Sequence, residues 1–154
     1  MAALSDYLES GISRYLFAGQ SFPVPANISI ALTTDVPQDN QNGSSIPEVP
    51  QTVEVSGETL NTGYARINYS TPASDGNTKW NFVEGGSGIT RNASQIVFNT
   101  ALQDWGLVSG IAILDSSVHG SGNLLLHAEL EKPREVCVGD SIKFDTNTLE
   151  IFLK

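Results

Sequence analysis

The chain has 154 residues, of which 40% are hydrophobic and 16% charged, and its 17 acidic and 8 basic side chains give a net charge of −9. This length fits one domain, over residues 1–154, and the apolar share is too high for a disordered chain and the charged share too low for a coiled coil. The negative charge repels phosphate backbones and anionic headgroups, so we expect neither nucleic acid nor membrane as a partner.

The N-terminal segment, residues 1–19, has the spacing of an amphipathic helix. Ser5 is a suitable N-cap and Gly19 a suitable stop. Gly11 lies in the middle of this helix and costs about 1 kcal/mol relative to alanine. We therefore expect the helix to depend on packing its apolar stripe against the rest of the fold or a neighbouring molecule. The apolar positions are Leu4, Leu8, Ile12, Tyr15 and Leu16.

The same segment lacks the features of a targeting signal. Asp6, Glu9 and Arg14 interrupt its apolar residues, and nowhere in the chain do 18 apolar residues run together. We expect a soluble protein made in a cytoplasm.

Beyond Pro25 the hydrophobic pattern changes to the two-residue period of a half-buried strand, beginning with Ile28, Ile30 and Leu32. Short apolar runs separated by turn residues follow at residues 53–55, 64–69, 80–82, 96–98, 107–114, 124–130, 136–138, 142–144 and 149–153. This spacing predicts a mainly β fold, an antiparallel β-sandwich or barrel-like sheet, with one N-terminal α-helix. Strand patterns do not alternate with helix patterns along the chain, which argues against a parallel α/β sheet.

A long polar loop is predicted over residues 35–52. Its first part, residues 35–50, is dominated by Asp, Asn, Gln, Gly, Ser and Pro, which favour turns and offer few apolar groups to bury. We expect this loop to be exposed. We also expect residues 37–50 to be mobile in the free protein and ordered only in an assembly, because burial there cannot offset the entropy of fixing the chain.

The residues that most often carry chemistry do not combine into a recognised site. Cys137 has no second cysteine to pair with, and we read it as a small strand residue rather than a reactive thiol. His119 falls in a turn, and His127 falls on the predicted exposed face of a strand, without the spacing of a metal site. The glycine-rich stretch at residues 85–88 precedes no helical pattern and lacks the spacing of a nucleophile elbow.

Two further patterns offer the residue types of binding sites. The group Asp35, Asp39, Asn40 and Asn42 offers oxygen ligands, but without the alternating order of a calcium loop, so a solvated turn is the better interpretation. Four aromatic residues could form a carbohydrate platform, yet each lies in or beside a strand pattern, which favours core packing. They are Tyr64, Trp80, Phe98 and Trp105.

Several short strings, distributed over nearly the whole chain, resemble a family of small tailed-bacteriophage virion proteins described as tail-fibre-like or capsid-decoration structural proteins. They are LSDYLE (4–9), ISIALTT (28–34), GYAR (63–66), DWG (104–106), GIAILD (110–115), GNLL (122–125) and GD (139–140). The chain departs from this pattern at residues 35–62, which are longer and richer in proline, so partner contacts made there do not carry over.

The resemblance implies a single β-rich virion structural domain with no catalytic residues. From the motifs we also expect no cofactor-binding and no metal-binding residues. Our leading expectation is a non-enzymatic capsid cement or decoration protein that stabilises the shell as a homo-oligomer. The alternative is a tail-fibre, neck or baseplate appendage involved in host attachment. The expected partners are other virion proteins, either the major capsid protein or tail and neck components. A small hydrolase is a third class, for which the sequence offers no assembled site.

Overall fold

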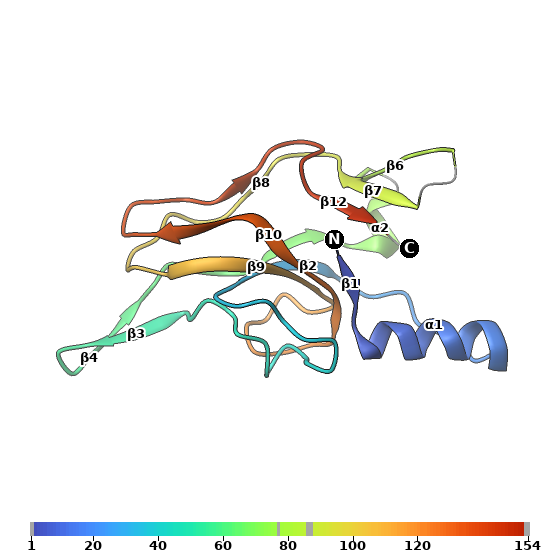
Figure 1. Cartoon of the computed structure of the whole chain (residues 1–154), viewed down its shortest axis with the longest axis horizontal. Coiled ribbons are helices and arrows are strands. Elements are labelled where there is room, and N and C mark those ends of the chain that lie inside the picture. The colour runs from blue at the N-terminus through green and yellow to red at the C-terminus, as the bar shows by residue number, and fades with distance from the viewer. Residues whose placement is uncertain (1, 77, 86–87, 153–154) are drawn as a thin grey trace.

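The largest element of the fold is a five-stranded antiparallel sheet (Figure 1). The structure is a computed structural model that describes residues 2–76, 78–85 and 88–152. The strand order is β1 (Ala3–Leu4), β10 (Leu124–Val136), β9 (Gly106–Leu114), β2 (Ile28–Thr33) and β5 (Ile67–Ser70). The β2 strand lies inside the sheet and pairs with β9 over residues 29–33. Both of its faces are buried over these residues, so the prediction of a half-buried strand is wrong, because small polar side chains such as Ser29 and Thr33 are covered as well.

Three smaller antiparallel sheets complete the β structure. They are β12 (Glu150–Phe152), β7 (Ile89–Asn92) and β6 (Trp80–Phe82); β11 (Lys143–Phe144) and β8 (Ile96–Val97); and β3 (Thr52–Val55) and β4 (Glu58–Asn61). A short helix, α2 (Pro72–Asp75), connects β5 to β6. The predicted mainly β, antiparallel fold with an N-terminal helix is confirmed, and the sheets formed by the described residues do not close into a barrel.

The main hydrophobic core lies on one face of the five-stranded sheet. Ile30 and Leu32 of β2 and Ile111 of β9 pack there against residues from the smaller sheets and their connections, including Ile96 and Ile142. In Figure 1, β8, β12 and β7 form a second layer over β9 and β10. The short alternating runs late in the chain are therefore short because they belong to small sheets that cover the main one.

The opposite face of the sheet is covered by the segment predicted as an exposed polar loop. Ile46 packs there against Ala112 and Leu114 of β9, whereas Val49 is fully buried in the main core, in the same cluster as Leu32. The Val49 amide donates to the Leu32 carbonyl at 3.0 Å, which holds the segment against β2. The prediction that residues 35–50 form an exposed loop is wrong at these positions, because a few well-spaced apolar side chains suffice to seat an otherwise polar segment.

The ends of several strands differ from the sequence-based prediction. The turn expected at residues 132–134 lies inside β10, where the pairing register with β9 shifts between Glu129 and Arg134. Such a bulge lets a strand pass through Pro133 without losing its pairing on either side. Cys137, expected within a strand, instead follows the end of β10 and is exposed. Of the strand predicted at residues 149–153, the structure places residues 150–152 in β12, and residue 153 lies outside the described residues.

Two elements project from the body of the fold (Figure 1). The first is helix α1 (Asp6–Ala18), which is capped by Ser5 and Gly19 as predicted. The second is the two-stranded hairpin β3–β4, which we call the arm and which pairs with no other strand of residues 2–76, 78–85 and 88–152. Ser56 and Gly57 at its tip both have positive φ, 52° and 84°, as a type I′ hairpin turn requires.

Candidate interaction surfaces

The most extensive group of polar contacts surrounds Arg66, just before β5. Its side chain is fully buried and forms a bidentate ion pair with Glu48, with Nε–Oε1 and Nη2–Oε2 distances of 2.8 and 2.7 Å. The remaining N–H groups donate to the carbonyl oxygens of Ser116, Ser121 and Gly43, at 2.9, 2.7 and 3.3 Å. All five guanidinium donors are thereby used, so this group ties the 43–49 and 116–121 segments to the main sheet.

Tyr64 extends this network into the core. Its hydroxyl donates to Glu48 Oε1 at 2.9 Å and accepts from the Leu32 amide at 3.0 Å. Burial, together with the negative charge of Glu48, raises the pKa of the Tyr64 phenol well above 10.0. The phenol therefore stays protonated and acts as a hydrogen-bond donor rather than as a base.

The two histidines are used to hold connecting segments in place. His127 is only 7% exposed, and its Nε2 lies 2.7 Å from Asp39 Oδ1. The expectation that His127 is partly exposed is therefore wrong. His119 lies in a turn, as predicted, with its Nε2 3.1 Å from the Val49 carbonyl oxygen.

The oxygen-rich residues of the 35–50 segment have separate local roles. Asp35 accepts a hydrogen bond from the Val36 amide, Asp39 contacts His127, and Asn42 Oδ1 accepts from the Ser44 amide. Among the described residues, no group of three or more His, Cys, Asp or Glu side chains is arranged to hold a metal ion. Residues 86–87 of the glycine-rich stretch lie outside the described part of the chain.

Cys137 lies in an acidic environment. Local desolvation and the carboxylates of Asp104, Asp140 and Glu135 raise the pKa of its thiol. A raised pKa lowers the fraction of nucleophilic thiolate at neutral pH. The environment thus opposes the reactive-thiol interpretation, although the side chain is exposed.

Three of the four aromatic residues weighed as a carbohydrate platform are core residues. Tyr64, Phe98 and Trp105 are 2–3% exposed, and the rings of Tyr64 and Trp105 meet edge to face at 5.5 Å. Trp80 is half-buried and donates from Nε1 to the Ser70 hydroxyl at 3.1 Å. Core packing, the preferred interpretation, therefore accounts for three of the four aromatic residues and for the buried part of Trp80.

The exposed surface of α1 is unusually apolar. Its apolar stripe begins at Leu8, which packs against the body, and becomes more exposed with each turn: Ile12 is 37%, Tyr15 60% and Leu16 64% exposed. No residue of α1 is buried. Beside the start of this stripe lies an apolar notch of about 290 Å³ between Leu8 and Phe82. Leu4, predicted as the first position of the stripe, lies instead in β1, where it pairs with Leu126 of β10. The other four predicted positions lie on α1, and in the described part of the chain only Leu8 of these joins a hydrophobic cluster.

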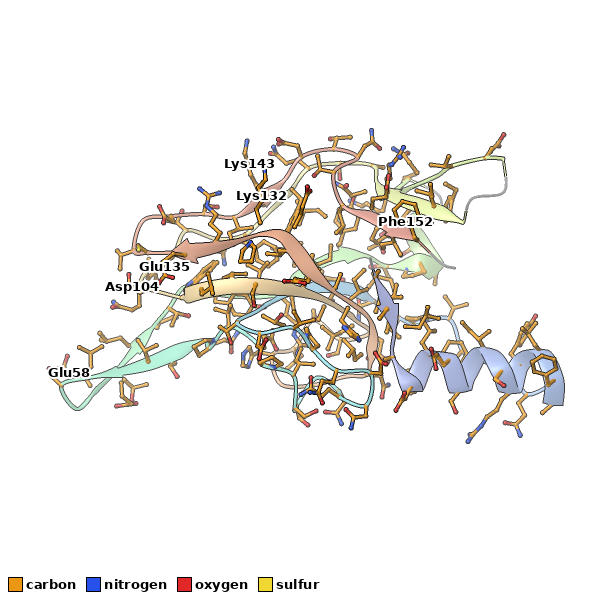
Figure 2. All side chains as sticks on the ribbon, viewed as in Figure 1. Glu58, Asp104, Lys132, Glu135, Lys143 and Phe152 are labelled. Carbon is orange, nitrogen blue, oxygen red and sulfur yellow. The ribbon has the colours of Figure 1, made fainter. Side chains whose placement is uncertain are left out.

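A second concave surface lies between β10 and the β11 and β12 strands, and we call it the groove. It has a volume of about 430 Å³, an apolar floor and a charged rim. Figure 2 shows Lys132 and Lys143 close together on this side of the molecule, with Phe152 further along. No sequence pattern indicated this surface, because its two walls are distant in the chain.

These features define a class of protein: a β-rich subunit whose polar network serves the fold and whose projecting elements and concave surfaces are available for contact. A family model described as podophage GP4 fiber I protein gp80 matches residues 3–152, and the chain belongs to this family. Membership makes it a phage structural fibre protein and implies a place in the virion. A comparison with curated proteins gave no match. Among the described residues, no helix is long and apolar enough to cross a membrane.

Proposed function

We propose that the protein is a non-enzymatic component of a phage tail fibre that works by binding other virion proteins, and that takes part in host attachment through the appendage it helps to build. The observation that carries this proposal is the match to a fibre family over residues 3–152. It favours the tail-appendage alternative over capsid cement, for which no feature of the chain speaks specifically.

The apolar stripe of α1 supports a role in assembly. Tyr15, Leu16 and Phe17 are 60%, 64% and 87% exposed near the free end of the helix. Exposed apolar surface costs roughly 25 cal/mol per Å² relative to burial, so a neighbour that covers these side chains gains several kcal/mol of binding free energy. A 13-residue helix with few contacts is also only marginally stable alone. A partner would therefore stabilise the helix as well as bind it.

The polar groups support a non-enzymatic role. Arg66, Glu48 and Tyr64 are engaged with one another and with the backbone, which leaves none of them free to bind or activate a substrate. Local desolvation and the acidic neighbours of Cys137 raise the pKa of its thiol, which disfavours the nucleophilic thiolate. These contacts support the proposal that the protein is not an enzyme.

Immunogold labelling of intact phage tests the location directly. We expect label on the tail fibres; label confined to the capsid shell would overturn the proposal in favour of a decoration protein. The assembly role is tested by complementing a phage that lacks the gene with Leu16→Glu. We expect this variant to fold but to be missing from purified particles.

Val118→Glu provides the matched control for that experiment. Val118 is 62% exposed, similar to Leu16, but lies in the β9–β10 connection. We expect it to enter particles at the wild-type level. Equal incorporation of the two variants would contradict a role for the α1 stripe.

A further inference from the structure

We propose that the arm of one copy docks into the groove of a second copy, so that the protein associates with itself through β3–β4 and the surface beside β10. The proposal concerns self-association, and it does not depend on where in the virion the protein lies.

The arm has one face suited to docking. Directly paired residues of antiparallel strands lie on the same face of a sheet, and side chains alternate between faces along each strand. Val53 pairs with Leu60 and Val55 pairs with Glu58. One face of the arm therefore carries Val53, Val55 and Leu60 with Glu58 near the tip, while Glu54 lies on the other face.

In the described part of the chain, this face joins no other sheet and no buried hydrophobic cluster. Val55 is 46% exposed. Two-stranded ribbons of this size are at best marginally stable alone. Figure 2 shows Glu58 at the far end of the arm, directed away from the body and away from the groove of its own copy.

The groove offers an unpaired strand and an apolar floor. Strand β10 pairs with β9 along one side, but on its other side β1 covers only Leu126 and His127. Beyond them the outer edge of β10 pairs with no strand among the described residues. Leu130, Phe144 and Leu149 line the groove next to this edge.

The charges of the arm and of the groove are complementary, which favours the arm of a second copy as the segment that binds in the groove. Glu54 and Glu58 are the only charged residues between residues 51 and 63, whereas Lys132, Arg134 and Lys143 line the groove. These are three of the eight basic residues in a chain of net charge −9. The side chains of Lys132 and Arg134 have no ion-pair or hydrogen-bond partner among the described residues, so their charge is available to an incoming carboxylate.

The acidic residues of the groove fix how the arm lies. Glu129 and Glu131 line the part nearer β1, and Glu150 is already paired with Arg91. The basic residues follow further along β10, which places the tip of the arm at that end. Because Pro133 has no amide hydrogen, the arm cannot add to β10 as a continuous strand. The contact therefore rests on the valines against the floor and on Glu58 against the basic rim.

Sedimentation velocity over a range of protein concentrations tests the proposal. We expect the wild-type chain to self-associate, and Glu58→Lys and Lys132→Glu each to weaken the dissociation constant about tenfold or more by placing like charges together. The two substitutions combined in one chain should recover most of the wild-type association. Glu54→Lys, on the opposite face of the same arm, is the matched control and should change association less than about twofold.

Disulfide trapping gives a second readout that does not depend on charge. In a Cys137→Ser background, chains carrying Val55→Cys and chains carrying Lys143→Cys are mixed under mild oxidation. We expect a disulfide that joins the two different chains. A wild-type chain that is monomeric at every concentration, single charge reversals without effect, or a double variant that associates no better than the singles would overturn the proposal.

Discussion

Arg66 and Glu48 form a buried bidentate ion pair that joins the 35–50 segment to the residues leading into β5. Their side chains are 0% and 3% exposed. Because each polar atom of the guanidinium has a partner, the pair is stable only as a complete unit. The segments on both sides of the pair therefore depend on it for their position.

Removing one partner should be much more costly than removing both. We expect Arg66→Ala to lower the free energy of unfolding by about 3–5 kcal/mol, because Glu48 is left buried without its counter-ion. The double variant Arg66→Met/Glu48→Leu should lose less than the two single substitutions added together. Urea unfolding of all the variants measures this. Arg91→Ala, at a half-exposed pair with Glu150, is the control and should cost at most about 1 kcal/mol. An equal loss at Arg66 and Arg91 would contradict this role.

The protonated phenol of Tyr64 makes the fold sensitive to alkaline pH. Its pKa in the folded protein is raised above 10.0. As the pH rises past that value, the unfolded chain loses the proton first and binds fewer protons than the folded chain, so the free energy of unfolding falls. We expect this fall above about pH 10 to be shallower in Tyr64→Phe than in the wild type. Tyr15→Phe, at a tyrosine that is 60% exposed, should keep the wild-type slope; a Tyr64→Phe slope equal to wild type would refute the assignment.

Gly11, in the middle of α1, lies against the ring of Phe22. A Cβ atom at this position would lie 2.1 Å from Phe22 Cε2, far inside van der Waals contact. Alanine should raise helix propensity by about 1 kcal/mol, but we expect Gly11→Ala to destabilise the protein by displacing the Phe22 ring. In a Phe22→Ala background the same substitution should become stabilising. Thermal unfolding distinguishes these outcomes, and a Gly11→Ala variant more stable than the wild type would show that the contact is unimportant.

The 35–50 segment should be ordered in the isolated protein. The amides of Ile46 and Val49 donate to the carbonyls of Asn42 and Leu32 at 3.0 Å, and both side chains are buried. These contacts favour slow amide exchange, in place of the mobility that composition alone predicts. Hydrogen exchange followed by NMR should find the Val49 amide protected to a degree approaching that of Ile111 in β9, and the Gly57 amide at the tip of the arm unprotected. Fast exchange at both Val49 and Ile46 would restore the mobile-loop interpretation.

The sequence predicted elements whose signal is local. The caps of α1, Ser5 and Gly19, and the alternation of Ile28, Ile30 and Leu32 follow from short-range rules of capping and pleating, and all were placed correctly. The segment around Val49 was misjudged because composition averages over residues, whereas burial depends on where the few apolar side chains lie.

The buried ion pair and the groove could not be predicted from any short sequence pattern. Glu48 and Arg66 are 18 residues apart and meet only in the fold. The groove joins β10 to β11 and β12, and its existence depends on β10 continuing through Pro133 where the sequence predicts a turn. The family resemblance was confirmed, and it indicated a fibre or decoration protein without indicating which surfaces make the contacts.

We propose that this chain is a structural subunit of the tail fibre that acts through contacts with other protein chains. Cryo-electron microscopy of the intact phage would locate the chain in the particle. We expect density for it within a tail fibre or its attachment, with Tyr15 and Leu16 of α1 buried against a neighbouring protein chain. Density for the chain on the capsid shell, or its complete absence from the particle, would contradict it.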